Sequence, residues 1–598
     1  MTINRPVRIG AGCSVDIALS LPQMVRGGNV DYIVIDFMTE VAVSNMKAAD
    51  MSAAGKGFGT GLVGPELERE LAEMMRKNIK LVTNAGGLHP MECADALRKM
   101  AEGLGLSPRI AVVMGDDVLE AVQQNAGKYT DMFNGEPVPD TLISANAYLG
   151  AKPVAEALAM GADIVITGRV VDSALIVGPL IHEFNWAMDD YDTLANGVLI
   201  GHLLECGPQP AGGTFTDWRE VDFSNISFPI AECYADGTAV FTKVEGTGGK
   251  ISVGTISEQI LYEIGDPQKY AMPEVMVDLS NVKVEALEND TVRVSGAKGL
   301  PPSGKYKVFG LVNQGWRAVV SGIATGRDAA EKAQLMGDAI ITRTERMLRV
   351  NNLGELKRSA VQVIGAGASQ GAQMGGPVDT REAVFRVLVD HDEKEAVDIM
   401  TRLSSTALVS MAPGTSVGNL GAPIVSPQMK MSAFLMDADL IPAKIVFEGD
   451  THELTPPVPA KPFTESMLVE NAPMPVAEAI EGVAVPLDKV AWLRSGDKGD
   501  KSNVGVIARD AAYLPYINAS MTNEAVAKWL AHLLTNPDAP KIERYELPGM
   551  NALNFLIDEA LDGGAVMSTR FDIMGKGVAQ QMVDFPVTVP AELAKSLI

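Results

Sequence analysis

The chain has few of the features that mark several common protein classes. Four cysteines occur in 598 residues, at positions 13, 93, 206 and 233, and they form no Cys-x-x-Cys pair. We therefore expect free thiols in a reducing compartment rather than a disulfide framework. No apolar run approaches the roughly 20 residues that span a bilayer, so we expect no membrane segment. The N-terminal residues lack a basic stretch followed by an apolar one, which predicts a cytoplasmic protein.

Basic residues are also in the minority. The chain has 50 lysines and arginines against 75 aspartates and glutamates, a net charge of −25. Because phosphate binding requires clustered basic residues, we do not expect a nucleic-acid partner. An acidic protein can still hold a small anion in a local basic pocket. We expect a small-molecule substrate and a homo-oligomer.

The order of predicted strands and helices indicates an α/β protein. Short apolar runs rich in β-branched residues, such as 32–36, 80–83 and 162–167, alternate with helical stretches of about ten to fifteen residues. This alternation predicts a large domain with a mainly parallel sheet. From about residue 226 the pattern changes to strands with few long helices between them, which predicts an α+β lobe.

The length of the chain exceeds what one hydrophobic core supports, so we predict more than one domain. The first covers 1–455, with a βα-rich lobe at 1–225 and a mixed α+β lobe at 226–455. The proline-rich stretch 456–484 is the predicted linker. Residues 485–598 form the predicted second domain. It opens with a strand, a loop at 495–503 and another strand, and it has a helix at 554–561, an order that suits a ferredoxin-like fold.

Glycines and polar residues follow each predicted strand of the first lobe. The endings are GAG at 10–12, DFMTE at 36–40, NAGGLHP at 84–90, MGDD at 114–117, SANAY at 144–148 and TGRVVD at 167–172. Ligands of parallel α/β folds bind beyond the carboxyl ends of the strands. Turns use the same residue types. The six endings together predict a functional rim.

The candidate catalytic residues lie within 161–215. A predicted helix over 192–206 puts His202, Glu205 and Cys206 on one face. His202 or Glu205 would serve as a general base. A helix C-terminus raises the pKa of a thiol, which argues against Cys206 as a nucleophile. The alternative is structural, with His202 and Cys206 in the core. The pattern is not a recognised zinc motif, so we predict no metal site.

Arg169 and Asp172 complete the candidate catalytic set. They follow the buried strand predicted at 162–167. Arginine presents a rigid fork of donors that suits a carboxylate or a phosphate, so Arg169 is a candidate anchor for an acidic substrate. The alternative is a local ion pair between the two residues.

Further polar residues are candidates for substrate binding. Backbone N–H groups at the 84–89 strand end would hold an oxyanion, although the stretch would also serve as a plain turn. The charged loop after position 493 would bind an anion or neutralise itself. Neither GAG at 10–12 nor GAG at 365–367 has the third glycine of a dinucleotide fingerprint, so we predict no cofactor. The candidate binding residues are Asn84, Gly86, Gly87, His89, Asn146, Arg494 and Lys498.

Several long motifs of this chain resemble the acyclic terpene utilisation protein family, AtuA. They are GADIVITGRVVDSAL at 161–175, GHLLECGPQPAGG at 201–213, EGTGG at 245–249, EQILYEIGDPQKY at 258–270 and RSGDKGDKSNVGVIAR at 494–509. The resemblance implies a large N-terminal domain and a small C-terminal domain with a ferredoxin fold. It also implies a link to the degradation of citronellol- and geraniol-type compounds, which proceeds through CoA thioesters. It supplies no catalytic set, so the residue roles above rest on the residues themselves.

Three functions are open at this point. The first is a lyase or hydratase that acts on a CoA thioester or a carboxylic acid by general acid–base chemistry. The second is a non-catalytic assembly subunit whose C-terminal domain docks a partner. The third is a hydrolase, which is the weakest because no Gly-x-Ser-x-Gly elbow occurs where a strand meets a helix.

Overall fold

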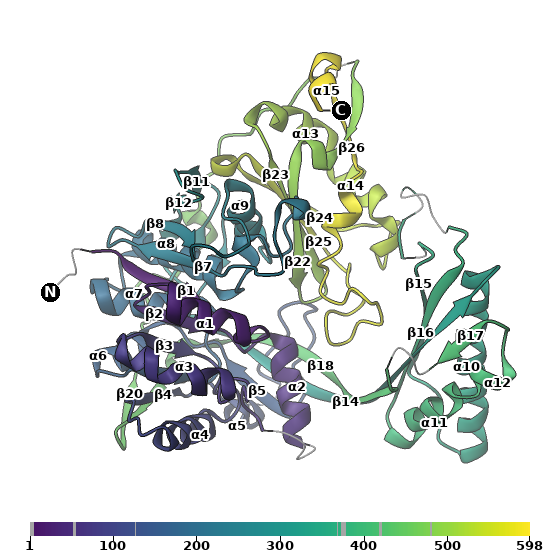
Figure 1. Ribbon diagram of the computed structural model, residues 1–598, viewed down its shortest axis with the longest axis horizontal. Coiled ribbons are helices and arrows are strands. Elements are labelled where there is room, and N and C mark those ends of the chain that lie inside the picture. The colour runs from purple at the N-terminus through teal and green to yellow at the C-terminus, as the bar shows by residue number, and fades with distance from the viewer. Residues whose placement is uncertain are drawn as a thin grey trace.

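The computed structural model describes residues 5–51, 56–125, 127–367, 369–371, 373, 378–417, 421–478 and 481–597. Its largest element is a mixed sheet of eleven strands (Figure 1). In spatial order these are β11 (Lys283–Ala286), β12 (Val292–Ser295), β8 (Ala239–Lys243), β7 (Pro229–Cys233), β1 (Val7–Ala11), β2 (Tyr32–Ile35), β3 (Lys80–Thr83), β6 (Ile164–Thr167), β4 (Ile110–Met114), β19 (Ala443–Phe447) and β20 (Asp450–Leu454).

Within this sheet, parallel pairing joins the five central strands β1, β2, β3, β6 and β4. Their side chains alternate between two apolar layers, so that Ile33 and Ile35 pack on one face and Tyr32 and Val34 on the other. Helices cover both faces. The predicted α/β class is therefore confirmed, although the outer strands are antiparallel and the sheet as a whole is mixed.

The helices of this domain form two groups. The first face carries α1 (Ile17–Gly27), α3 (Pro65–Arg76) and α4 (Pro90–Gly103), and the second carries α6 (Lys152–Ala159), α7 (Ala174–Phe184) and α8 (Tyr191–Glu205). The remaining elements are α2 (Glu40–Met51), α5 (Leu119–Gln124), α9 (Val253–Leu261) and a small sheet of β13 (Lys298–Leu300), β10 (Met276–Asp278) and β9 (Tyr270–Ala271).

One predicted strand does not belong to the central sheet. Residues 144–147 form β5 (Ser144–Ala147), which pairs antiparallel with β14 (Lys305–Thr325). The expected rim of six strand ends therefore has five, and the polar ending at Asn146 is placed by a different sheet. Its pairing partner lies more than 150 residues away in the chain, so no local pattern reveals it.

The long strands β14 and β18 (Ile424–Asp437) form an antiparallel ribbon that leads away from the large sheet (Figure 1). Its far end belongs to residues 316–426, which we call the peripheral lobe. The other elements of this lobe are α10 (Ala329–Asn351), β15 (Arg358–Ile364), β16 (Glu382–His391), α11 (Lys394–Ser404), α12 (Ala407–Ser410) and β17 (Thr415–Val417).

The C-terminal domain has the expected ferredoxin-like architecture, with a four-stranded antiparallel sheet β22-β23-β25-β24 over its own apolar core. Its elements are β21 (Val483–Pro486), β22 (Ala491–Lys498), β23 (Lys501–Ala508), α13 (Leu514–Ser520), α14 (Asn523–Trp529), β24 (Ile542–Leu547), β25 (Ala552–Ile557), β26 (Pro586–Val589) and α15 (Ala591–Leu597).

Two local predictions in this domain are wrong. The expected helix at 554–561 does not form, because residues 554–557 belong to strand β25 and residues 558–561 to no helix or strand. The expected loop at 495–503 is a tight hairpin in which Lys498 pairs with Lys501 around a two-residue turn, with Gly499 at φ 66°. Charges at the tip find partners elsewhere, since Asp500 accepts the N–H of Gly563 at 2.8 Å. Within the described part of the chain, no helix is both long and apolar enough to cross a membrane.

Candidate functional site

A cavity of about 970 Å³ lies between the carboxyl edge of the central strands and the C-terminal domain. Its volume falls in the range of small-molecule sites. The wall draws on segments that follow β1 and β2, on the end of α8, on β14 and β18, and on the β22–β23 hairpin. The ionisable and thiol side chains of its lining include those of Cys13, Asp36, Glu40, Asp172, Glu205, Cys206, Tyr262, Glu263, Lys307, Asp497, Lys498 and Lys576.

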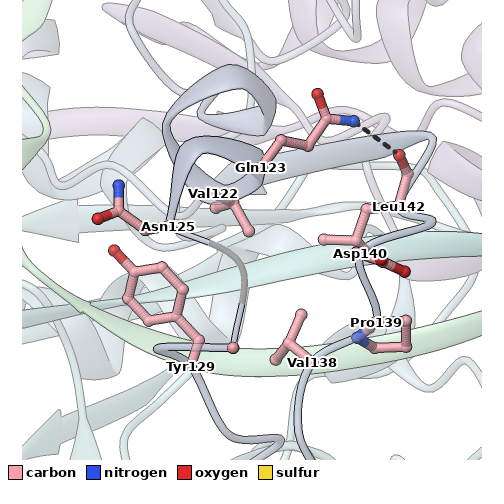
Figure 2. A pocket seen from close by; sticks show the side chains of 9 residues that line it. Val122, Gln123, Asn125, Tyr129, Val138, Pro139, Asp140 and Leu142 are labelled. Atoms are coloured by element: carbon pink, nitrogen blue, oxygen red, sulfur yellow. Dashed lines mark hydrogen bonds between the residues drawn. The ribbon is translucent and has the colours of Figure 1, made fainter.

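A second pocket is far smaller and does not compete as a site. Residues of α5 and the chain that follows it line the pocket, including Val122, Gln123 and Tyr129 (Figure 2). Gln123 donates to the carbonyl of Leu142 at 3.3 Å across its edge. Its volume of about 10 Å³ is room for about one water molecule.

His202 and Glu205 meet at the last turn of α8. The predicted helix is capped at its other end by Asp190, which accepts the N–H of Thr193. Nδ1 of His202 lies 3.1 Å from Oε1 of Glu205, and the two side chains are 2% and 9% exposed. The cavity reaches Glu205, and His202 lies behind it with its ring edge-on to Tyr270. The two predicted residues are therefore in contact.

Burial favours the neutral form of both members of this pair. Burial, helped by the Lys498 ammonium, lowers the pKa of His202 to about 4. Burial and the nearby Asp36 carboxylate raise the pKa of Glu205 well above its usual range. The pKa of the Cys206 thiol is also raised by burial, which removes the basis for a thiolate nucleophile. At neutral pH the pair holds a proton next to the cavity.

Arg169 and Asp172 form the ion pair that the sequence left as one of two alternatives. Their Nη2 and Oδ1 atoms are 3.1 Å apart. The Arg169 guanidinium is buried, lies 3.9 Å from the ring centroid of Tyr148 and donates to the carbonyl of Met38. Asp172 is one-third exposed, and that exposure is to the cavity. Arg169 thus stands behind the wall, whereas the Asp172 carboxyl forms part of it.

The electrostatic balance at Asp172 favours the protonated form. Burial raises the pKa of this carboxyl well above its usual range, although Arg169 opposes the increase. Asp36 and Glu205 add to the increase. Asp172 and Glu205 are therefore two carboxyls in one cavity that resist simultaneous ionisation.

The turn at 84–89, which we predicted to bind an oxyanion, lies outside the cavity wall and supports a residue that lines it. Asn84 is fully buried, accepts the N–H of Phe37 at 2.6 Å and donates to Asp36 at 2.5 Å. Its amide therefore orients Asp36, which does face the cavity. Gly87 has φ 57° and its N–H is bonded to the Asn84 carbonyl, whereas His89 lies 3.1 Å from Asp50.

The tight packing at Gly86 also reflects a structural role. A Cβ added to Gly86 would lie 2.4 Å from the carbonyl oxygen of Thr167. Asn146 has a similar supporting position, because its side-chain amide donates to Asp116 at 2.8 Å. Asp116 in turn accepts the N–H of Arg169 at 2.9 Å, and burial raises the pKa of this carboxyl to about 6. These residues fix the turn that carries Arg169.

The C-terminal domain supplies the opposite wall of the cavity. Arg494 is buried, lies 4.3 Å from the ring centroid of Tyr262 and donates to Gln209. Lys498 faces the cavity, with its ammonium 5.8 Å from the ring centroid of Tyr270. Of the two predicted residues, Arg494 therefore supports the wall and Lys498 forms part of it.

Several wall residues were given no role from the sequence, among them Asp36, Glu40, Tyr262, Lys307 and Lys576. Glu40 accepts a hydrogen bond from the hydroxyl of Tyr148 at 2.6 Å and lies 3.5 Å from Lys307. Burial alone would raise the pKa of Glu40, but the nearby Lys307 and Arg169 cations hold it far below the usual range. Lys576 donates to the hydroxyl of Tyr262. Asp36 and Glu40 belong to a polar strand ending that the sequence marks. Lys307 and Lys576 come from segments that are distant in the chain, and no spacing rule connects them to the polar strand endings.

Among the residues that the structure describes, no three His, Cys, Asp or Glu side chains form a group that could hold a metal ion. Two family models match the chain. Residues 7–447 match "Acyclic terpene utilisation family protein AtuA", and residues 485–588 match "AtuA ferredoxin-like domain". No curated protein matches the chain.

Proposed function

The chain belongs to the acyclic terpene utilisation (AtuA) family, and we propose that it is a lyase or hydratase of acyclic terpenoid catabolism. The substrate is an acyl-CoA thioester or the corresponding carboxylic acid. One observation carries the proposal: Glu205 and Asp172 open on a single cavity, and burial raises the pKa of both carboxyls. Two carboxyls that share protons can give one and accept one.

The roles follow from the surroundings of each carboxyl. Glu205, backed by neutral His202, is the general acid that protonates the leaving hydroxyl in the elimination direction. The pKa of Asp172 is raised as well, but its ion pair with Arg169 opposes the increase, so we assign Asp172 as the carboxyl that gives up its proton and then, as the base, removes the α-proton. His202 is a positioning residue, because it lies behind Glu205 rather than in the cavity wall.

The negative charge that develops on the substrate needs a cation. Arg169 is engaged with Asp172, Tyr148 and Met38, so it is not the anchor. Lys498 and Lys576 face the cavity from the C-terminal domain, and we assign the enolate or carboxylate oxygen to them. This arrangement favours an enzyme over an assembly subunit, because the C-terminal domain contributes to the wall.

The test is turnover of branched α,β-unsaturated acyl-CoA thioesters and of the matching free acids. Water addition removes the conjugated absorbance, and in heavy water it places deuterium at the α-carbon. Glu205→Gln should abolish the reaction while circular dichroism stays unchanged. Glu68→Gln, on the exposed surface of α3, is the matched control. Undiminished turnover by Glu205→Gln, or no wild-type turnover of any member of the panel, would end the assignment.

A further inference from the structure

One part of the cavity wall is held in place by the peripheral lobe. Residues 561–576, which we call the strap, follow β25 in the C-terminal domain. The structure describes all of these residues and assigns no helix or strand to them. The strap nevertheless contributes Gly563, Ala565, Met567, Met574 and Lys576 to the cavity wall. A long segment without regular structure needs partners from elsewhere to keep one conformation.

Three arginines of the peripheral lobe supply those partners. Arg317 donates to the carbonyls of Ser568 at 2.8 Å and Met567 at 2.9 Å. Arg358 donates to the Met567 carbonyl at 2.9 Å and forms two bonds to Asp562 at 2.9 and 2.8 Å. Arg386 donates to the Thr569 carbonyl at 2.9 Å. Three successive carbonyls of the strap are thus held by charged donors.

The three arginines are themselves fixed on adjacent strands. Arg317 is buried on β14 and forms two bonds to Asp390 of β16, at 2.7 and 2.8 Å. Arg358 of β15 pairs in register with the same Asp390. Arg386 of β16 donates to Gln362 at 2.6 Å. Because the donors are oriented before they meet the strap, they lose little freedom on binding it.

The end of the strap carries a cavity lysine. Asp572 accepts the N–H groups of Lys576 at 3.0 Å and Gly577 at 2.8 Å, which fixes the turn at this end. The Lys576 ammonium then lies 4.5 Å from the ring centroid of Tyr262 and donates to its hydroxyl. A displacement of the strap would therefore move a cation that faces Cys206 and Asp497 across the cavity.

We infer that the peripheral lobe is the positioning element of this cavity: Arg317, Arg358 and Arg386 hold the strap, and the strap sets the place of Lys576. The three arginines are positioning residues, and Arg358 also lines the cavity. Only their effect on turnover rests on the function proposed above, because the hold on the strap does not depend on which reaction occurs.

The experiment compares Arg358→Ala, Arg386→Ala and the double variant with Arg343→Ala. Arg343 is the matched control, because its guanidinium bonds to Thr406 and Ser410 inside the same lobe. Arg317→Ala is avoided, since it would leave Asp390 buried without its partner. The measurements are amide hydrogen exchange by mass spectrometry and the rate at which an acylating reagent modifies Lys576, both without substrate.

In the double variant, exchange of peptides from 561–576 should become on the order of tenfold faster or more, as expected for the loss of charged hydrogen bonds. Lys576 should react faster, and peptides of α10 should keep their wild-type rates. Arg358→Lys should restore part of the protection. Unchanged strap exchange in the double variant would overturn the inference. Equal acceleration across the whole lobe would also overturn it, because that is unfolding rather than lost positioning.

The two proposals fail separately. If the strap loosens in the arginine variants but the wild type turns over no thioester or acid, the positioning role is supported and the proposed reaction is wrong. If a substrate is turned over but hydrogen exchange of the strap is unchanged in the double variant, the proposed reaction is supported and the positioning role is wrong. Where turnover is present, the arginine variants should raise KM in the same direction as Lys576→Met, because they displace the same cation.

Discussion

Oε1 of Glu205 lies 3.1 Å from Nδ1 of His202, and the cavity meets the carboxyl side of this pair. Burial drives the pKa values of the two groups in opposite directions, lowering that of the imidazole and raising that of the carboxyl. Burial therefore favours the neutral form of each group. The fold therefore stores a proton at the wall of a substrate-sized cavity, at a cost in stability that depends on pH.

Glu205→Gln should stabilise the protein, and the gain should grow with pH. The folded protein keeps a proton on Glu205 that the unfolded chain releases above the ordinary carboxyl pKa, so stability falls as pH rises from about 4.5 toward the raised pKa. Glutamine removes this dependence. Each unit by which folding raises the pKa of Glu205 lowers the free energy of unfolding by about 1.4 kcal/mol once the pH exceeds the raised pKa. Melting temperatures of Glu205→Gln and Glu68→Gln, measured between about pH 5 and pH 8, provide the check.

The opposite trend would contradict this account. If the melting temperature of Glu205→Gln fell further below that of the wild type as pH rose, the native carboxyl would be ionised and favourably paired. A general acid at this position would then have no stored proton to give.

Lys498→Met and Lys576→Met should weaken the binding of an anionic substrate. Each variant removes a cation from the cavity wall while keeping much of the side-chain volume. The loss of one charged hydrogen bond is worth about 1.5–3 kcal/mol, so KM should rise roughly tenfold to hundredfold. Lys489→Met, at an exposed position of the same domain, is the control. Unchanged KM in both cavity variants would remove the assigned anion site.

Gly86→Ala should destabilise the protein by about 1–3 kcal/mol, because its Cβ would lie 2.4 Å from a backbone oxygen and the backbone must move. Gly103→Ala near the end of α4 is the control, since a Cβ there meets nothing within 4 Å. Alanine favours a helix over glycine, so this variant should be neutral or slightly stabilising. Chemical denaturation measures both. A neutral Gly86→Ala would show that the 84–89 turn is not tightly packed.

The sequence is informative where structure is local. Residues 164–167 are buried on both faces, and their apolar run predicts the strand. The spacing of His202 and Glu205 within one helix predicts their contact, which the structure contains. The strand at 552–557 is mistaken for a helix because it too is buried on both faces, so its side chains show no alternation.

The rest of the site depends on contacts between distant segments. Lys307, Lys498 and Lys576 reach one cavity from three different sheets or loops, and no spacing rule connects them. Arg169 shows the same limit. Its position after a buried strand is correct, but Tyr148 and Met38 decide that its guanidinium is covered. The local sequence pattern predicts that a residue lies at the edge of the sheet, whereas tertiary contacts determine whether its charged group faces the cavity.

Asp217→Ala should loosen the C-terminal domain from the large domain. Both carboxylate oxygens of Asp217 accept from Arg509, at 2.6 and 2.7 Å, and one also accepts from the indole of Trp492 at 2.9 Å. These side chains are about one-quarter exposed, so the loss should be about 2–3 kcal/mol. In calorimetry the variant should show an earlier transition for one domain, with a change in tryptophan fluorescence. Asp189→Ala, on the surface of the large domain, is the control.

Asp217→Asn should have a smaller effect, because the amide oxygen still accepts from Trp492 while the charge that pairs with Arg509 is lost. Other bonds between the domains remain in both variants, among them those that Asn503 donates to the Leu261 carbonyl at 2.6 Å and Asn554 to the Ile264 carbonyl at 2.8 Å. The domains should therefore loosen without separating. A single transition at the wild-type temperature in Asp217→Ala would show that these amides and the apolar contacts suffice, and that the Asp217 carboxylate adds nothing to the closure of the cavity.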